Sequence, residues 1–327
     1  MPSFASFGND LYTGRRSIDF VGRRRIWYGI AAILMLVSVL AVGVRHLNPG
    51  IEFRGGTEFR ISGTSVTSEI AGEEAVHRVV PGAEVRVSRL NQDSIRVQAD
   101  QVSDAQLEPV RQSLATTYEV GADQVSRNFV GPTWGADVTR QALIGLFVFL
   151  ALVAAVIALY FRTWTMAAAA LVALVHDLLL TVGIYALVGF EVTPASVIGF
   201  LTILGYSLYD TVVVFDKVRE NTEHITTSTK RTFGEAANLA INQTLVRSIN
   251  TSVVALLPVG AILFIGAFLL GAGTLKDIAL SLFVGIAAGT YSSIFIATPL
   301  LVQLREREPE QRAQAARVLR RRAEGRA

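Results

Sequence analysis

One carboxylate lies inside a long apolar stretch, and its position is the clearest sign of chemistry in the chain. Asp210 stands within residues 199–221, where Leu, Ile, Val and Phe predominate. It precedes Asp216, at the polar end of the stretch, by about 9 Å if the segment is a helix with a rise of ~1.5 Å per residue. A carboxylate at the centre of a membrane helix costs about 2.5–3.5 kcal/mol on insertion scales, and such residues usually lie on ion or proton pathways. Asp210 therefore predicts a site that binds a proton or an ion.

The residues on the same helix face support this interpretation. Counting back from Asp210 by three or four positions gives Tyr206, Thr202 and Gly199, a stripe that runs from polar to small residues. Small residues let membrane helices approach one another closely. We expect this stripe to face partner helices, while the other faces meet lipid or apolar helices.

Two further ionisable positions lie in or at the edge of apolar runs. Arg247 opens one run, with Asn250 and Thr251 one helical turn further along the same face, and the pair His176-Asp177 lies midway along another. An Arg favours the ionised form of a nearby carboxylate, whereas burial favours the protonated form. We therefore expect a proton relay that involves Asp210, Arg247 and Asp177. It would operate as the helices move. The structural alternatives are an Asp–Arg bridge that pins two helices, and a buried Asp177 bonded to Ser or Thr hydroxyl groups.

Composition places the chain in the membrane and excludes several kinds of site. Of the 327 residues 51% are hydrophobic, and the mean hydropathy is +0.44, which is too apolar for a soluble protein of this size. The absence of Cys excludes disulfides and thiolate chemistry, and the four His, at positions 46, 77, 176 and 224, lack zinc-site spacing. There is no P-loop motif for nucleotide hydrolysis. We expect a polytopic membrane protein that is not an enzyme and needs no metal or cofactor.

Long apolar runs predict six membrane-spanning helices, at residues 26–45 and at about 140–161, 165–189, 193–216, 248–270 and 276–303. The first could instead be a cleaved signal peptide, but it is long enough to span and has no clear cleavage site, so we expect a retained helix. Short connections at 190–192 and 271–274 contain no Lys or Arg. Basic residues cluster at the other side, which predicts cytoplasmic termini and no nucleic-acid partner. They include Arg23-Arg24-Arg25 in the N-terminal segment 1–25, Arg162, Lys217, Arg219, Lys230, Arg231, Arg305, Arg307, Arg312, Arg317 and Arg320-Arg321-Arg322.

Residues 46–138 form an insert that is expected outside the cytoplasm. Its pattern predicts a strand at 51–61 interrupted by Gly55-Gly56, a helix at 68–80, strands at 83–90 and 94–99 joined by a turn at 91–93, a helix from Ser103 to about 118, and a strand at 125–130. The order β-α-β-β-α-β is that of the ferredoxin-like split βαβ unit. The insert shows no catalytic constellation.

The remaining segments complete the predicted bundle at residues 139–304. Thr232-x-x-Glu235 predicts the cap of an amphipathic cytoplasmic helix at 232–247, which we interpret as an interfacial helix packed on the bundle. Residues 305–327 predict a flexible or partly helical basic tail at the membrane surface. Pro258 predicts a kink, and therefore a hinge, in the fifth span. In the sixth span Gly285, Gly289 and Ser292 form a small-residue face for helix packing.

Five motifs, in order along residues 17–304, resemble those of the SecF family, which supplies a subunit of the bacterial SecDF protein-translocation complex in the resistance-nodulation-division (RND) superfamily. They are Gly50–Thr57, Val130-Gly131-Pro132 with Gly135, Gly205–Asp216, Asn242–Arg247 and Gly289–Phe295. The resemblance implies an α-helical polytopic membrane protein, one six-span RND-type half with an inserted ferredoxin-like α+β extracytoplasmic domain. It also implies a bacterial cytoplasmic membrane location.

The resemblance further implies that the proton-motive force is used to help draw secreted polypeptides out of the SecYEG channel. In the family, the motif residues that fall on Asp210 and Arg247 are linked to proton passage. The implied partners are SecD, SecYEG, the unfolded polypeptide and the lipid bilayer, with YajC and YidC as further candidates. Two positions depart from the family pattern, because Glu52 stands where Asp is usual and Tyr209 stands where Asn is usual.

Two alternatives to a coupled translocation subunit remain open at this point. A small-molecule efflux transporter of the same superfamily would favour twelve spans and two large outer domains in one chain. A non-catalytic scaffold of the translocon would need no proton at the buried carboxylate. RND-type transporters pair two six-span halves, and the small-residue faces of the fourth and sixth spans have no evident mate in the sequence. We therefore expect an obligate complex.

Overall fold

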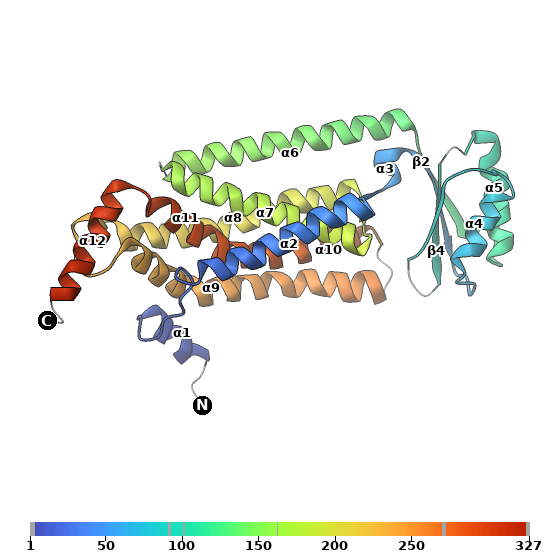
Figure 1. Cartoon of the computed structure of the whole chain (residues 1–327). Helices are drawn as coiled ribbons and strands as arrows, with labels where there is room; N and C mark the ends of the chain where they lie inside the picture. The colour runs from blue at the N-terminus through green and yellow to red at the C-terminus, as the bar shows by residue number, and fades with distance from the viewer. Residues whose placement is uncertain (1–3, 91–92, 101, 162, 270–272, 325–327) are drawn as a thin grey trace.

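The computed structural model describes residues 4–90, 93–100, 102–161, 163–269 and 273–324. The molecule is elongated, with a small α+β domain at one end, a bundle of long helices in the middle, and both chain ends at the opposite end (Figure 1). Parts of several predicted segments lie outside the described residues. These are positions 1–3 of the N-terminal segment, the turn at 91–92, Arg162, position 270 of the fifth span, positions 271–272 of the last outer connection, and positions 325–327 of the tail.

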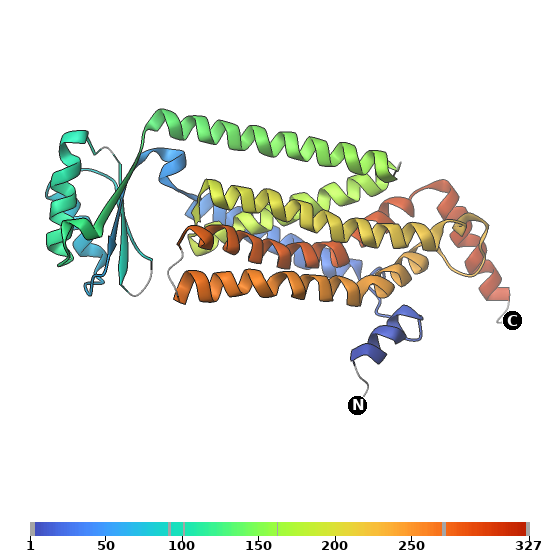
Figure 2. The ribbon, with the colours of Figure 1, turned by 180° about the vertical axis from the view of Figure 1, so that it is seen from behind.

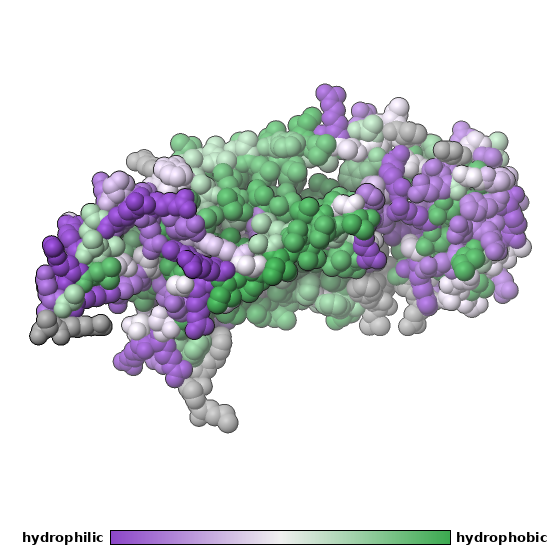
Figure 3. All heavy atoms as spheres, in the orientation of Figure 1, coloured by the Kyte–Doolittle hydropathy of each residue, from purple (hydrophilic) through white to green (hydrophobic). Residues whose placement is uncertain are grey.

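Among the described residues, six helices are long and apolar enough to cross a membrane, which confirms the predicted fold class. Their exposed side chains form an apolar band between two polar ends (Figure 3). Seen from behind, α8, α9 and α10 lie side by side (Figure 2). The spans are built from α2 (Arg24–Arg45), α6 (Pro132–Phe161), α7 (Trp164–Val188), α8 (Pro194–Thr222), α9 (Phe233–Ala261) with the π-helix η3 (Ile262–Leu269), and α10 (Gly273–Ser292) with the π-helix η4 (Ser293–Ala297) and α11 (Thr298–Arg305).

The α+β domain has the predicted ferredoxin-like topology. Its sheet has the order β3-β4-β2-β5 with antiparallel neighbours, and α4 and α5 cover one face (Figure 1). The buried residues of that face include Phe59, Ile61 and Val97 from the strands and Leu114 and Tyr118 from the second helix region. The elements are β2 (Gly56–Ser62), α4 (Glu69–His77), β3 (Val85–Arg89), β4 (Ser94–Ala99), α5 (Asp104–Thr117), the 3-10 helix η1 (Ala122–Gln124) and β5 (Val125–Val130).

The start of this domain differs from the prediction of a strand at 51–61. Ile51–Arg54 form a helical turn, α3, and the first strand begins only at Gly56. The chain turns at Gly55 (φ 80°) and Gly56 (φ 128°), where residues with a side chain are disfavoured. The turn packs on the start of α6, where a Cβ at Gly135 would lie 2.8 Å from the Phe53 carbonyl oxygen. The double glycine therefore ends a helical turn instead of interrupting a strand.

A second, two-stranded sheet joins the domain to the bundle. β1 (Asn48–Pro49), just after α2, pairs in parallel with β6 (Glu191–Val192), in the connection between α7 and α8. The entry to the α+β domain is therefore fixed to the loop that precedes α8.

The helix predicted at 232–247 and the helical part of the predicted tail are both present. The Thr232 capping box is formed, and α9 continues from it without a break into the fifth span. The tail, predicted to be flexible or partly helical, contains the helix α12 (Pro309–Glu324), packed on the loop that contains the 3-10 helix η2 (Ile225–Thr227). Gln314 is buried there and donates to the carbonyl oxygens of Ser228 (3.0 Å) and Arg231 (2.8 Å). The short helix α1 (Phe4–Tyr12) packs on α9 at the same end.

Candidate functional site

Asp210 lies where three helical segments meet. Its side chain is buried, with a residue exposure of 6%. Ser248 of α9 donates to one carboxylate oxygen and Ser293, at the start of η4, donates to the other, each over 2.7 Å between oxygens. Both oxygens of Asp210 are thus held by neutral hydroxyl groups.

Asp177 forms a second carboxylate site of the same kind and has no exposed surface. Its Oδ2 accepts hydrogen bonds from Ser207 of α8 (2.5 Å) and Ser292 of α10 (2.7 Å). Its Oδ1 lies 3.1 Å from His176 Nδ1. This is the arrangement foreseen in the structural alternative for Asp177, a buried Asp bonded to hydroxyl groups.

The two carboxylate sites share their supporting elements. Ser207 lies three residues before Asp210 on α8, and the neighbours Ser292 and Ser293 serve one carboxylate each. The change from α-helix to π-helix falls between these two serines, and π-helical turns are frequent at functional sites. A displacement of α8 or of this turn would therefore act on both carboxylates together.

Apolar layers close the carboxylate pair on both sides along α8. On the outer side, Ile203 is buried and packs on Gly285, where a Cβ would collide with its side chain. On the inner side, Val214 and Phe215 have no exposed surface. The pair is thus occluded in this conformation.

The residues of the predicted stripe do not share one environment. Gly199 and Asp210 are buried, Tyr206 is half-buried, and Thr202 is exposed and bonds only within its own helix, to the Ile198 carbonyl oxygen (2.8 Å). Within this chain the buried face of α8 follows a slightly different line, and contact of the stripe with a partner's helices stays a prediction. That line is Ser196, Gly199, Ile203, Ser207, Asp210 and Val214.

Arg247 and its predicted neighbours lie outside the carboxylate pair. The Arg247 side chain is exposed and donates to the Tyr209 hydroxyl over 3.2 Å. Asn250 is exposed, and Thr251 bonds to the Arg247 carbonyl oxygen over 2.9 Å. Among the described residues, Arg247 therefore contacts the hydroxyl of Tyr209, the residue that departs from the family pattern. It does not contact the carboxylate of Asp210, the next residue in the chain.

The small residues of α8 and α10 pack against each other. A Cβ at Gly199 would meet Ser281, and one at Gly289 would lie 2.8 Å from Ser207 Cβ. The expectation that these two faces lack a mate was therefore wrong, because each is the mate of the other within this chain. On α10, close packing occurs as expected at Gly285 and Gly289. Ser292, on the same face, also donates a hydrogen bond to Asp177.

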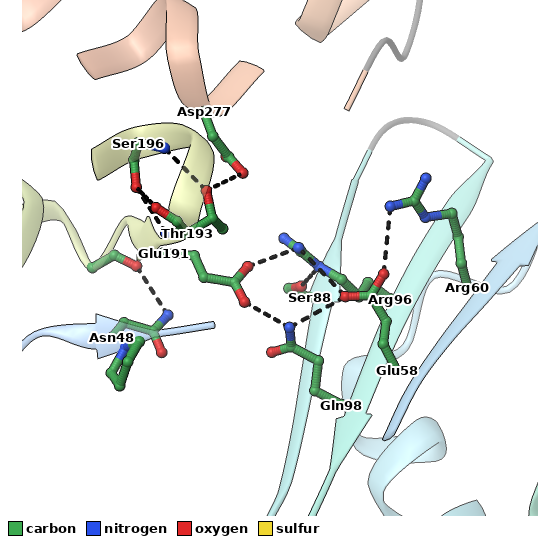
Figure 4. A network of polar contacts seen from close by, with 12 residues as sticks. Asn48, Glu58, Arg60, Ser88, Arg96, Gln98, Glu191, Thr193, Ser196 and Asp277 are labelled. Carbon is green, nitrogen blue, oxygen red and sulfur yellow. Dashed lines mark hydrogen bonds and ion pairs between the residues drawn. The ribbon is translucent and has the colours of Figure 1, made fainter. Parts of the chain in front are cut away.

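A polar junction links the α+β domain to the bundle, and sequence reasoning missed it (Figure 4). Glu191 of β6 forms an ion pair with Arg96 (2.7 Å) and accepts a hydrogen bond from Gln98 (2.6 Å), both on β4. Glu58 of β2 lies beside them, 3.3 Å from the Gln98 amide nitrogen. Two residues after Glu191, Thr193 caps α8 and donates to Asp277 of α10 over 3.1 Å. The uncovered face of the sheet is thus tied to the start of α8.

Glu52 lies close to this junction, and its carboxylate is only partly paired. One of its carboxylate oxygens is buried and has no hydrogen-bond partner among the described residues. Burial raises the pKa of Glu52, and the negative charges of Glu191 and Glu58 raise it further. Glu52, which stands where the family usually has Asp, thus has a carboxyl group that is protonated more easily than usual.

The serines at both carboxylates are the functional residues that sequence reasoning missed. Ser248 follows Arg247 directly, and Ser207 lies one turn from Asp210, but both occur among apolar residues where small side chains mostly indicate packing. Ser292 was recognised only as part of a small-residue face, and Ser293 is its neighbour. The junction gave no local signal, because Arg96 and Glu191 are far apart in sequence.

Comparison with known proteins shows which family this chain is similar to. Residues 110–307 match the family described as "Protein export membrane protein SecD/SecF, C-terminal", and residues 40–63 match the "SecD/SecF GG Motif". The protein translocase subunit SecF of Streptomyces coelicolor is 49% identical over 99% of this chain and 87% of its own length. The SecF of Mycobacterium tuberculosis strain H37Rv is 44% identical over 98% of this chain and 74% of its own length.

A solved structure agrees with the sequence relatives. The crystal structure of SecDF from Thermus thermophilus superposes with a TM-score of 0.77 at 30% sequence identity, over 89% of this chain. This chain corresponds to 39% of that longer chain. The relatives, the solved structure and the two family matches agree, and the chain therefore belongs to the SecF family of SecD/SecF protein-export membrane proteins.

Proposed function

We propose that this protein is a subunit of a protein-export complex that uses the proton-motive force to assist movement of polypeptides out of SecYEG. The observation that carries the proposal is the pair of occluded carboxylates, Asp177 and Asp210, at the crossing of α7, α8, α9 and α10. The names of the SecF and SecDF relatives supply the translocation context.

Hydroxyl partners suit a carboxylate that changes its protonation state. A Ser hydroxyl can donate to an ionised carboxylate or, after rotating, accept from a protonated one. Ser207, Ser248, Ser292 and Ser293 can therefore bond to Asp177 and Asp210 in either state. A proton that moves inward supplies ~2.3 kcal/mol per 100 mV of membrane potential, which is enough to shift the balance between two conformations.

A single helix connects Asp210 to the outer domain. Asp210 lies on α8, α8 is capped by Thr193, and Glu191 of the same loop holds the outer sheet through Arg96 and Gln98. A proton-driven shift of α8 would therefore displace the outer domain directly. Arg247 acts in this proposal as the cation at the exposed edge of the pathway, poised on Tyr209.

The remaining assignments follow from this proposal. The outer domain lies outside the cytoplasm, and both termini and α12 lie inside it, in the cytoplasmic membrane of a bacterium. The membrane partner is SecD, and the channel is SecYEG. The domains are the segments 1–25, 26–45, 46–138, 139–304 and 305–327.

The first experiment compares secretion by inverted vesicles that contain this chain with its SecD partner, with and without a proton gradient. Asp210→Asn keeps the size of the side chain but not its charge, so we expect gradient-dependent stimulation to fall nearly to zero while the complex still assembles in a pull-down. The control is Asp216→Asn, on the same helix, which accepts a hydrogen bond from the exposed Tyr160 (2.9 Å) and should keep stimulation. Full stimulation by Asp210→Asn would remove this residue from proton transfer and favour the scaffold hypothesis.

A further inference from the structure

A groove runs along the membrane-facing side of α2, α7 and α11. Its volume is about 630 Å³, and its walls are almost entirely apolar. They include Ala31 and Ala32 of α2, Val172 and Val175 of α7, and Leu300 of α11. A groove of this depth between membrane helices accepts an extended apolar chain.

The end of the groove nearest the chain termini is basic. A second hollow of about 360 Å³ is lined by Arg24, Arg25 and Arg307, together with Glu306. Tyr28 and Gln303 line both hollows, so the basic hollow opens directly onto the apolar groove.

The charges in the basic hollow favour an anion. Arg24 is paired with Glu306 at 2.7 Å, which leaves the positive charges of Arg25 and Arg307 in excess. Both of these side chains are exposed, and neither forms an ion pair with a described residue. Arginines bind phosphate groups through charge-assisted hydrogen bonds, and basic pockets between membrane helices on the cytoplasmic side bind anionic head groups.

Two polar atoms of residues that line the apolar groove have no hydrogen-bond partner among the described residues. The Tyr28 hydroxyl is buried and has no hydrogen-bond partner among the described residues. His176 is 2% exposed, and its Nε2 likewise has no partner there, while its Nδ1 lies 3.1 Å from Asp177. An occupant of the groove would therefore reach the wall of one of the buried carboxylate sites.

We propose that this groove is a binding site for one anionic phospholipid. The phosphate lies between Arg25 and Arg307 and accepts a hydrogen bond from the Tyr28 hydroxyl. The acyl chains extend between α2 and α7 and cover the ring of His176. The ligand is a lipid because one continuous surface offers cations at its end and an apolar wall along the rest, and it is anionic because the cations exceed the acids in the hollow.

The test uses the full chain with its SecD partner, purified in a mild detergent, with native mass spectrometry to count bound lipids. Phosphatidylglycerol and phosphatidylcholine with the same acyl chains are titrated separately, and the thermal stability is measured in parallel. We expect one phosphatidylglycerol to remain bound and to raise the melting temperature, whereas phosphatidylcholine binds more weakly.

Two pairs of variants separate the head-group site from the acyl groove. Arg25→Gln with Arg307→Gln should weaken phosphatidylglycerol binding roughly 30-fold, since a basic side chain near the surface contributes ~1 kcal/mol for an anionic lipid. The control, Arg15→Gln with Arg320→Gln, removes the same charge from exposed positions elsewhere and should bind as the unaltered chain does. Ala32→Trp fills the groove and should weaken binding of both lipids, whereas Ile33→Trp, its exposed neighbour on α2, should not.

Three outcomes would overturn the proposal. One is equal binding of the two lipids, and another is equal loss in both arginine pairs, which would indicate a general effect of net charge. The third is lipid binding by the isolated chain that disappears in the complex, which would mean that a helix of the partner covers the groove. Circular dichroism and elution volume confirm that each variant is folded before it is compared.

Discussion

The carboxylates inside the bundle and the carboxylate at the junction are held by different chemistry. Both oxygens of Asp210 and Oδ2 of Asp177 accept hydrogen bonds from serine hydroxyls, which are neutral, while Oδ1 of Asp177 lies 3.1 Å from His176 Nδ1. Glu191 instead faces the guanidinium of Arg96 at 2.7 Å. Neutral partners tolerate both states of a carboxyl group, whereas a permanent cation stabilises only the ionised one. Among the described residues, the carboxylates between the membrane helices are thus held without the guanidinium that fixes the charge at the junction.

The largest effect is expected at the fully buried site. Asp177→Ala would leave the Ser207 hydroxyl without a partner in a closed environment, while Ser292 keeps a bond to the Gly289 carbonyl oxygen (3.2 Å). Buried unsatisfied polar groups cost about 1–3 kcal/mol each, and loss of the side chain adds a cavity, so we expect roughly 2–4 kcal/mol of destabilisation. The thermal stability of the purified protein measures it.

The matched variant for this site is Asp177→Asn, which keeps one acceptor oxygen and the shape of the side chain. We expect it to lose about half as much stability as Asp177→Ala. If both variants were as stable as the unaltered chain, the hydroxyl groups would not depend on the carboxylate, and the contrast with the junction would fail.

A smaller effect is expected at the junction. Glu191→Gln keeps the shape but removes the charge, and charge-assisted hydrogen bonds contribute about 1.5–3 kcal/mol. We expect the α+β domain to spread to a wider range of positions while the bundle keeps its stability. High salt should reduce the difference from the unaltered chain, because it screens the ion pair that only the unaltered chain has. The chain contains no Cys, so spin labels can be placed at Thr116→Cys on α5 and Val188→Cys on α7, and the distance distribution between them measured.

The control for this measurement is Glu108→Gln. Glu108 pairs with Arg111 at 3.2 Å within α5, so its loss does not cross the junction. An unchanged distance distribution in Glu191→Gln would show that the remaining ties, β1 with β6 and α3 with α6, hold the two parts together without this ion pair.

The smallest effect concerns Glu52 and pH. Because the pKa of this carboxyl group is raised in the folded protein, its neutral form is favoured, and the stability that it contributes is present at low pH and lost as the pH rises through the raised pKa. We expect the same label pair to show looser docking as the pH increases above the ordinary carboxyl range. Glu52→Gln should abolish this dependence, and a dependence that persists in it would have to come from another group.

The elements were largely predictable from sequence, because strands of period two and apolar runs of spanning length leave strong local patterns. Asp210 was predictable for the same reason, since a charge in an apolar helix stands out. Its partners were not, because Ser248 and Ser293 reach it only through the packing of three helical segments, which a single sequence does not specify. The helical turn at Ile51–Arg54 was missed because a Gly-Gly pair fits both a strand interruption and a helix end.

The even number of crossings has a consequence for how such subunits combine. Both chain ends lie at the end of the molecule opposite the outer domain (Figure 1). A second six-helix unit could therefore be joined to this one by a simple linker, without an additional passage through the lipid and without inverting either unit. The solved SecDF chain, of which this chain matches 39%, has a length that leaves room for such an arrangement. This topology is thus compatible both with a single fused chain and with two separate chains.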